Sequence, residues 1–137
     1  KGQDILSIIE LTKVGSKRID EEHREILLLL ETIIGGLDDP AGTGALADRL
    51  GELEVLWEKH TATERQVFME HGYPFHDHFE THHAIADKIR SLRQRATESE
   101  DAARLQRDVL AIVLDFYGHE SLGDVDFRNW LVFKGME

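Results

Sequence analysis

The sequence predicts an all-α fold, namely an up-down-up-down antiparallel four-helix bundle with an N-terminal arm and a short C-terminal helix. Three observations support this prediction. Apolar residues recur at alternating steps of four and three residues, which is the spacing of one buried helix face. No stretch of useful length alternates with the period of two that a strand requires. The second and third connections are short, which favours antiparallel neighbours.

Composition and charge limit what the chain can do. Its 137 residues, of which 41% are hydrophobic, indicate one domain that is large enough to bury a core. The chain has no cysteine, so disulfides and thiolate metal sites are excluded, and nitrogen and oxygen must hold any metal. The formal net charge of −11 argues against nucleic acid and anionic membrane as partners, because phosphates would be repelled.

The sequence shows neither a membrane-spanning segment nor an export signal. Apolar runs such as residues 26–30 and 109–114 are far too short to cross a bilayer. The N-terminal stretch carries the acids Asp4 and Glu10 and has no signal-like apolar segment. We therefore expect a cytoplasmic protein with no membrane contact by this domain. Because the chain begins at Lys1 and not at Met, we also expect a piece of a longer protein.

The first helix is predicted to follow an irregular arm. Residues 1–18 show no firm period and are expected to pack as an arm across the core. The helix begins at Ile19, with Asp20 suited to the positive end of the helix dipole. The pair Gly35-Gly36 ends it, and a loop follows over residues 38–44. The predicted buried face consists of Ile19, His23, Ile26, Leu30, Ile33 and Leu37.

The second and third helices are predicted to meet at a tight turn. Gly72-Tyr73-Pro74 breaks the second helix, and Pro74 is suited to start the third. Polar residues 97–101 then make a short turn. The buried face of the second helix consists of Leu46, Leu50, Leu53, Trp57, His60, Glu64 and Val67. The buried face of the third consists of Phe75, His78, His82, Ile85, Ile89, Leu92 and Ala96.

The fourth helix is predicted to stop in the region of Gly118 and Gly123. Its buried face consists of Leu105, Val109, Ile112, Phe116 and His119. The remaining chain suggests a short closing helix. The predicted organisation is a single domain over residues 1–137, with the arm at 1–18, the bundle at 19–122 and a C-terminal segment at 123–137.

Polar residues occupy core positions in all four predicted helices. A lone core histidine is more often a hydrogen-bonded residue than a ligand, but burying a carboxylate without a partner costs several kcal/mol. In antiparallel neighbours the start of one helix lies level with the end of the next, so these side chains are expected to converge on one end of the bundle. They are His23, His60, Glu64, His78, His82 and His119, with Asp124 just beyond.

Five imidazoles and two carboxylates are too many ligands for one small divalent ion. They suit two metal ions that the carboxylates bridge. Imidazole and carboxylate without thiolate fit iron, manganese or zinc, and spacing alone does not choose among these metals.

Five segments of the chain resemble the hemerythrin family, specifically the bacterial hemerythrin-like domains. They are Ile19-Asp20-Glu21-Glu22-His23, His60-x3-Glu64, Gly72-Tyr73-Pro74, His78-x3-His82 and His119-x4-Asp124. The resemblance covers roughly residues 8–130 and is strongest to the domains attached to bacterial chemotaxis receptors and other sensory proteins.

This resemblance implies a non-haem site with two iron ions. His78, His82 and His119 would hold one iron, and His23 and His60 the other. Glu64 and Asp124 would bridge the two irons, with an oxo or hydroxo group as the third bridge. The iron with two histidines would keep an open position for O2. The implied function is an O2- or redox-sensing module of a larger bacterial signalling protein, fused to signalling domains.

The chain departs from the family pattern at three positions beside the expected ligands. Thr61 stands where the family commonly has Phe, and Arg65 where it commonly has a second Glu. Glu120 stands where an apolar residue usually lines the O2 pocket. Its carboxylate either turns to solvent or acts in the O2 pocket, as an extra ligand to the open iron position or as a hydrogen-bond partner of what binds there.

Three other functions compete with O2 binding for sensing, storage or delivery. The first is a di-iron peroxidase or oxidase, in which peroxide would be the substrate and Glu120 the proton relay. A ferritin-like oxidase is disfavoured, because Glu80-x-x-His83 is the only pair of that spacing. A zinc protease is disfavoured, because His119 and Glu120 are not followed by a second histidine. The remaining histidines, at 71, 76 and 83, are expected at the surface.

Overall fold

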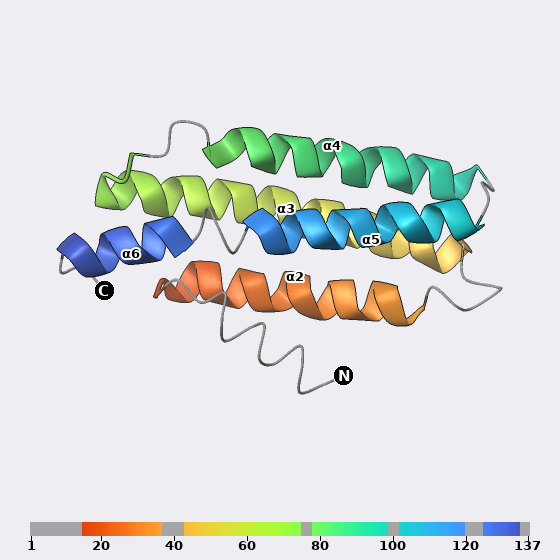
Figure 1. Ribbon diagram of the computed structural model, residues 1–137, viewed down its shortest axis with the longest axis horizontal. Helices are drawn as coiled ribbons and strands as arrows, with labels where there is room; N and C mark the ends of the chain where they lie inside the picture. The colour runs from red at the N-terminus through yellow and green to blue at the C-terminus, as the bar shows by residue number, and fades with distance from the viewer. Residues whose placement is uncertain (1–14, 37–42, 75–77, 99–101, 120–124, 135–137) are drawn as a thin grey trace.

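The protein is a bundle of antiparallel helices (Figure 1). The computed structural model describes residues 15–36, 43–74, 78–98, 102–119 and 125–134. These residues form helices α2 (Lys17–Gly35), α3 (Thr43–His71), α4 (His78–Thr97), α5 (Ala102–His119) and α6 (Val125–Lys134). The described ranges contain no strand. The predicted all-α bundle with a C-terminal helix is therefore confirmed, and the N-terminal arm lies mostly outside the described residues.

Local sequence explains where α2 begins and where α2 and α3 end. α2 begins at Lys17, two residues before the predicted start, because the Ser16 side chain accepts a hydrogen bond from the backbone N of Ile19. It ends at Gly35 as predicted. α3 ends at His71 because Gly72 adopts a φ of 67°, which lets the backbone N of Tyr73 reach the carbonyl of Phe68 at 2.9 Å.

The other helix boundaries differ by a few residues from the predicted ones. α3 already includes Thr43, which was predicted to lie in the loop. α5, in contrast, ends at His119, within the predicted region of Gly118 and Gly123. The described part of α4 begins at His78, so the predicted start at Pro74 and Phe75 is not covered by the described helix. Leu37 also lies outside the described residues.

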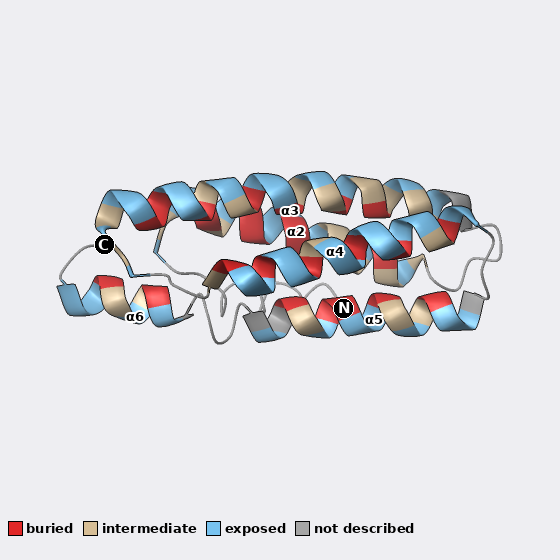
Figure 2. Cartoon of the chain, turned by 90° about the horizontal axis from the view of Figure 1, so that it is seen from above, coloured by how far each residue is buried: buried red, intermediate tan, exposed pale blue. Residues whose placement is uncertain are grey.

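The four long helices bury one stripe each along a common core (Figure 2). α2 packs on α3, α3 on α4 and α4 on α5, while α5 returns to α2. Trp57 belongs to this core and is 1% exposed. The buried members include Ile26, Leu30, Leu50, Leu53, Ile85, Ile89, Leu105, Val109 and Phe116. None of the described helices is long and apolar enough to cross a membrane.

A second, smaller apolar cluster closes one end of the bundle. Phe68 of α3 packs against Phe127 of α6, with ring centroids 4.5 Å apart, and against Phe79 of α4 at 5.8 Å. Ile19 of α2 and Leu131 of α6 complete the cluster. The short C-terminal helix is thereby held against the end of α3.

We expect Leu53→Ala to lower the free energy of unfolding by about 2–5 kcal/mol, because it leaves a cavity at a site that is 2% exposed. Urea denaturation followed by circular dichroism measures this loss. The control is Leu114→Ala on α5, where the side chain is 69% exposed and the loss should stay below about 0.5 kcal/mol. Equal losses in the two variants would contradict the assigned core.

Candidate metal centre

Five of the predicted ligands come together at one end of the bundle. α2 supplies His23 from its second turn, α3 supplies His60 and Glu64, and α4 supplies His78 and His82. On α3 and on α4 the two residues are four positions apart, so both point from the same helix face. The set of five is buried except for His78, which is partly buried.

Glu64 lies between two pairs of histidines. Its Oε2 is 3.1 Å from Nε2 of His60 and 3.9 Å from Nε2 of His23. Its Oε1 is 3.0 Å from Nε2 of His82 and also contacts Nε2 of His78. Each oxygen of this one carboxylate therefore faces its own pair of imidazole nitrogens.

The two groups have the composition of a pair of cation sites. The ligand atoms of His23, His60 and Glu64 lie within 4.8 Å of one another, and so do those of Glu64, His78 and His82. Nε2 of His60 and Oε2 of Glu64 are both fully buried and lie 3.1 Å apart. A cation between a lone pair and a carboxylate satisfies both, so the donor set fits two metal ions that share Glu64.

A second buried carboxylate holds the outer nitrogen of His60. Glu22 is 7% exposed, and its Oε1 is 3.2 Å from Nδ1 of His60. The hydroxyl of Thr63 donates to the other oxygen of Glu22 at 2.7 Å. Sequence reasoning did not single out Glu22. The available signal was its spacing, three residues after Ile19 and four before Ile26, which places it on the buried face of α2.

His82 is held from α3 by two different residues. The indole Nε1 of Trp57 donates to the backbone carbonyl of His82 at 2.8 Å, and the two rings stack with centroids 4.7 Å apart. The hydroxyl oxygen of Thr61 lies 2.8 Å from Nδ1 of His82. A second departure from the expected pattern, Arg65, places its guanidinium 4.4 Å from the ring centroid of Phe79.

The metal-free site holds a proton on His60. Burial has the largest single influence and lowers the pKa of His60, but the charge of Glu64 and hydrogen bonds to Glu22 and Glu64 together outweigh it. The charge of His23 also lowers this pKa. The net result raises the pKa of His60 from 6.5 to about 10. At neutral pH the ring is therefore charged until a metal replaces the proton.

Metal uptake at pH 7 is expected to release at least one proton, because Nε2 of His60 must be unprotonated to coordinate and its pKa of about 10 lies well above that pH. Affinity should accordingly fall as the pH is lowered. Calorimetric titration with zinc in two buffers of different ionisation enthalpy measures the number of protons. An identical heat in both buffers would contradict the expected release.

The remaining predicted site residues are covered only in part. His119 is the last residue of α5, whose end lies at the end of the bundle where α4 begins (Figure 1). The His119 side chain, Glu120 and Asp124 lie outside the described residues, so their roles stay predictions. Among the histidines expected at the surface, His83 is exposed and His71 is half-buried beside Phe127. His76 lies outside the described residues.

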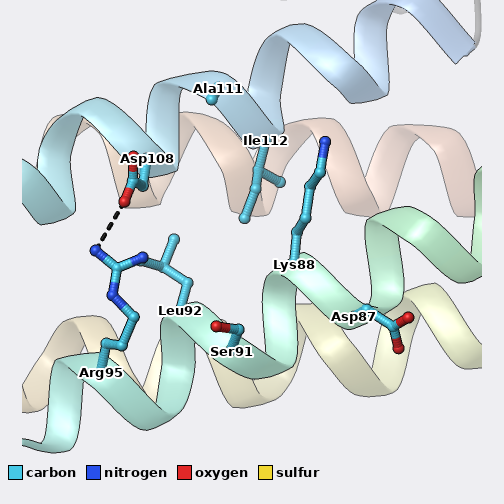
Figure 3. A pocket seen from close by; sticks show the side chains of 8 residues that line it. All are labelled: Asp87, Lys88, Ser91, Leu92, Arg95, Asp108, Ala111 and Ile112. Carbon is cyan, nitrogen blue, oxygen red and sulfur yellow. Dashed lines mark ion pairs between the residues drawn. The ribbon is translucent and has the colours of Figure 1, made fainter.

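A separate groove between α4 and α5 contains none of the clustered histidines (Figure 3). It has a volume of about 380 Å³. Its two cationic side chains are both in ion pairs, Arg95 with Asp108 at 2.7 Å and Lys88 with Asp115 at 2.5 Å. The histidine cluster is therefore the better candidate for a reactive centre.

Comparison with family models gives one match. The model described as "Hemerythrin HHE cation binding domain" matches residues 14–121. This span contains the five clustered residues and His119, whereas Asp124 lies beyond its end. No curated protein and no solved structure matches the chain.

Proposed function

The chain belongs to the hemerythrin HHE cation-binding family, and from this premise we propose that it is a non-haem di-iron domain that binds O2. The observation that carries the proposal is the position of Glu64. One buried carboxylate presents an oxygen to each of two histidine pairs, which is the arrangement that a bridging ligand between two metal ions requires.

The two proposed metal positions differ in their ligands. His23 and His60 would hold one iron, and His78, His82 and His119 the other. Glu64 and Asp124 would bridge them. The position with two histidines would keep room for an external ligand, and an open coordination site is what separates a reactive centre from a structural one.

Apolar side chains around the proposed site support reversible binding over turnover. Trp57 packs against His60 and His82, with ring centroids 5.4 and 4.7 Å away. Phe68 and Phe79 lie beside His78 at 4.9 and 5.0 Å. Such walls limit access of water and protons to a bound ligand. The role we propose is O2 or redox sensing, as the input module of a larger bacterial signalling protein such as a chemotaxis receptor.

Reconstitution tests this function. The full chain is loaded with ferrous iron without oxygen and then exposed to air while its optical spectrum is recorded. We expect an oxygen-dependent charge-transfer band that disappears when oxygen is removed and returns with it. Immediate and irreversible oxidation of the iron, with turnover of peroxide and a reductant, would replace the O2-binding proposal by the enzymatic one.

A di-iron peroxidase or oxidase is the second candidate, and Glu120 is the observation that favours it. This carboxylate follows directly on the proposed ligand His119, where it can block the open position or relay a proton. We expect Glu120→Ile to make the oxygenated form longer-lived by about 100-fold or more, because a positioned proton-transfer group contributes about 10²–10⁴-fold to a rate. Autoxidation of the two proteins at the same rate would make Glu120 a bystander.

A further inference from the structure

The ring of His82 has two nitrogens with different surroundings. Nε2 points to Glu64 at 3.0 Å, in the direction of the proposed metal. Nδ1 points to the hydroxyl oxygen of Thr61 at 2.8 Å. Only one of the two nitrogens of a neutral imidazole carries a proton, so the partner of Nδ1 decides whether Nε2 is free to coordinate.

The hydroxyl of Thr61 has one proton, and the helix already uses it. Thr61 Oγ1 donates to the backbone carbonyl of Trp57, one turn earlier in α3, at 2.8 Å. The same oxygen can therefore meet Nδ1 of His82 only as an acceptor. It follows that Nδ1 keeps its proton when a metal binds, so Nε2, which lies 3.0 Å from Oε1 of Glu64, is the nitrogen whose lone pair would be free to coordinate.

The corresponding atom of His60 has a different partner. Nδ1 of His60 faces the carboxylate of Glu22 at 3.2 Å, whereas Nδ1 of His82 faces an uncharged hydroxyl. A carboxylate partner raises the basicity of a ligating imidazole more than a neutral one does. The two metal positions thus receive imidazoles of unequal donor strength from the protein itself.

We propose that Thr61 is a positioning residue, which fixes the tautomer and ring orientation of His82 and so sets the affinity of the metal position formed by His78 and His82. The inference rests on the proposed pair of metals but not on what the metals bind. It gives a physical role to Thr61, one of the residues at which this chain departs from the family pattern. A phenylalanine there offers no acceptor to His82.

Trp57 fixes the positions of both partners in the contact between Thr61 and His82. Its indole holds the backbone of His82 and stacks on its ring, while its own carbonyl fixes the direction of the Thr61 hydroxyl proton. The ring of His82 is therefore held by one contact on its face and one at its edge. Loss of the hydroxyl removes the edge contact and leaves the stacking in place, so the ring can rotate about its χ2 angle.

The test is a titration of the metal-free chain with Co²⁺, followed by its d–d absorption, in Thr61→Val and Thr61→Ser. Valine keeps the shape of threonine without its hydroxyl, and serine keeps the hydroxyl. We expect two binding steps in the unmodified chain. In Thr61→Val one step should weaken about 10–100-fold while the other is unchanged, and Thr61→Ser should restore it.

Thr32→Val is the matched control. The Thr32 hydroxyl makes the same kind of bond to the carbonyl one turn earlier, that of Leu28 at 3.1 Å, but at an exposed position of α2. This variant should bind both metals normally. Any effect of losing a hydroxyl-to-carbonyl bond on helix stability alone should therefore be the same in Thr32→Val and Thr61→Val.

Nuclear magnetic resonance of the zinc-loaded chain gives a readout that is independent of affinity. The Nδ1 proton of His82 should be visible and protected from exchange in the unmodified chain and in Thr61→Ser, and it should exchange rapidly in Thr61→Val. Unchanged metal binding and unchanged proton exchange in Thr61→Val would overturn the proposal. So would an equal weakening of both metals together with lower stability, which indicates a purely structural role.

These outcomes are distinct from failure of the proposed function. A chain that binds two metals but no O2, with one step weakened in Thr61→Val, would support the role of Thr61 and reject O2 binding. A chain that binds O2 with unaltered metal steps in Thr61→Val would support the function and reject the role of Thr61. Absence of a second metal step in the unmodified chain would reject both.

Discussion

Replacement of Glu64 by glutamine is expected to lower the metal content from about two ions per chain to less than one, because an amide offers one oxygen where the bridging role needs two anionic ones. The side chain of Glu64 is fully buried between the two histidine pairs, so no neighbouring group can take its place from solvent. Metal analysis after loading with ferrous iron and removal of the excess measures the change.

Glu58→Gln is the control for this substitution, because Glu58 lies on the same helix but is exposed. It should keep the full metal content. Circular dichroism of Glu64→Gln should show the helical spectrum of the unmodified chain, since the larger core cluster does not include Glu64. Retention of two tightly bound ions by Glu64→Gln would refute its bridging role.

Metal loading is expected to raise the Tm by roughly 10–20 °C. A ligand that binds only the folded chain, at a free concentration of about 1,000 times its Kd, adds about 4 kcal/mol to the free energy of unfolding. For a domain of this length each kcal/mol shifts the Tm by about 3–5 °C. Differential scanning calorimetry of the chelated and the iron-loaded chain measures the shift.

The physical reason for this large shift is the charge inside the metal-free core. Glu64 and His60 are both fully buried and lie 3.1 Å apart, and burial of charged groups is costly. Two cations neutralise the carboxylate and satisfy the imidazole nitrogens at once. Glu64→Gln should lose most of the gain, and an unchanged Tm after loading the unmodified chain would contradict the account.

The fold followed from the sequence because one simple rule governs the core. Each long helix buries one stripe with steps of four and three, and the buried set, from Ile26 to Phe116, is largely the set that this spacing predicts. The same rule located the polar cluster. His23, His60, Glu64 and His82 are buried because they occupy stripe positions, and antiparallel packing then placed them at one end.

The residues around the ligands were harder to find, because their partners come from other helices. Glu22 reaches His60 across 38 positions of the chain, and Thr61 reaches His82 across 21. Both contacts depend on the rotation and height of neighbouring helices, which periodicity does not specify. Thr61 was recognised only as a departure from a pattern, and its hydrogen bonds became visible only in three dimensions.

The helix boundaries missed by a few residues for local reasons. The Ser16 cap extends α2 to Lys17, although no apolar residue before Ile19 marks the stripe there. α5, by contrast, ends at His119, inside the region of Gly118 and Gly123 where two glycines predicted its end. Helix boundaries depend on small free-energy contributions such as a single cap, whereas the buried helix faces depend on the much larger free energy of burying apolar side chains.

Anomalous diffraction from crystals of the iron-loaded chain, collected at the iron absorption edge, tests the central claim most directly. Two peaks per chain are predicted, one beside His23 and His60 and the other beside His78 and His82, with an oxygen of Glu64 next to each. A single peak, or two peaks that do not share Glu64, would contradict the account.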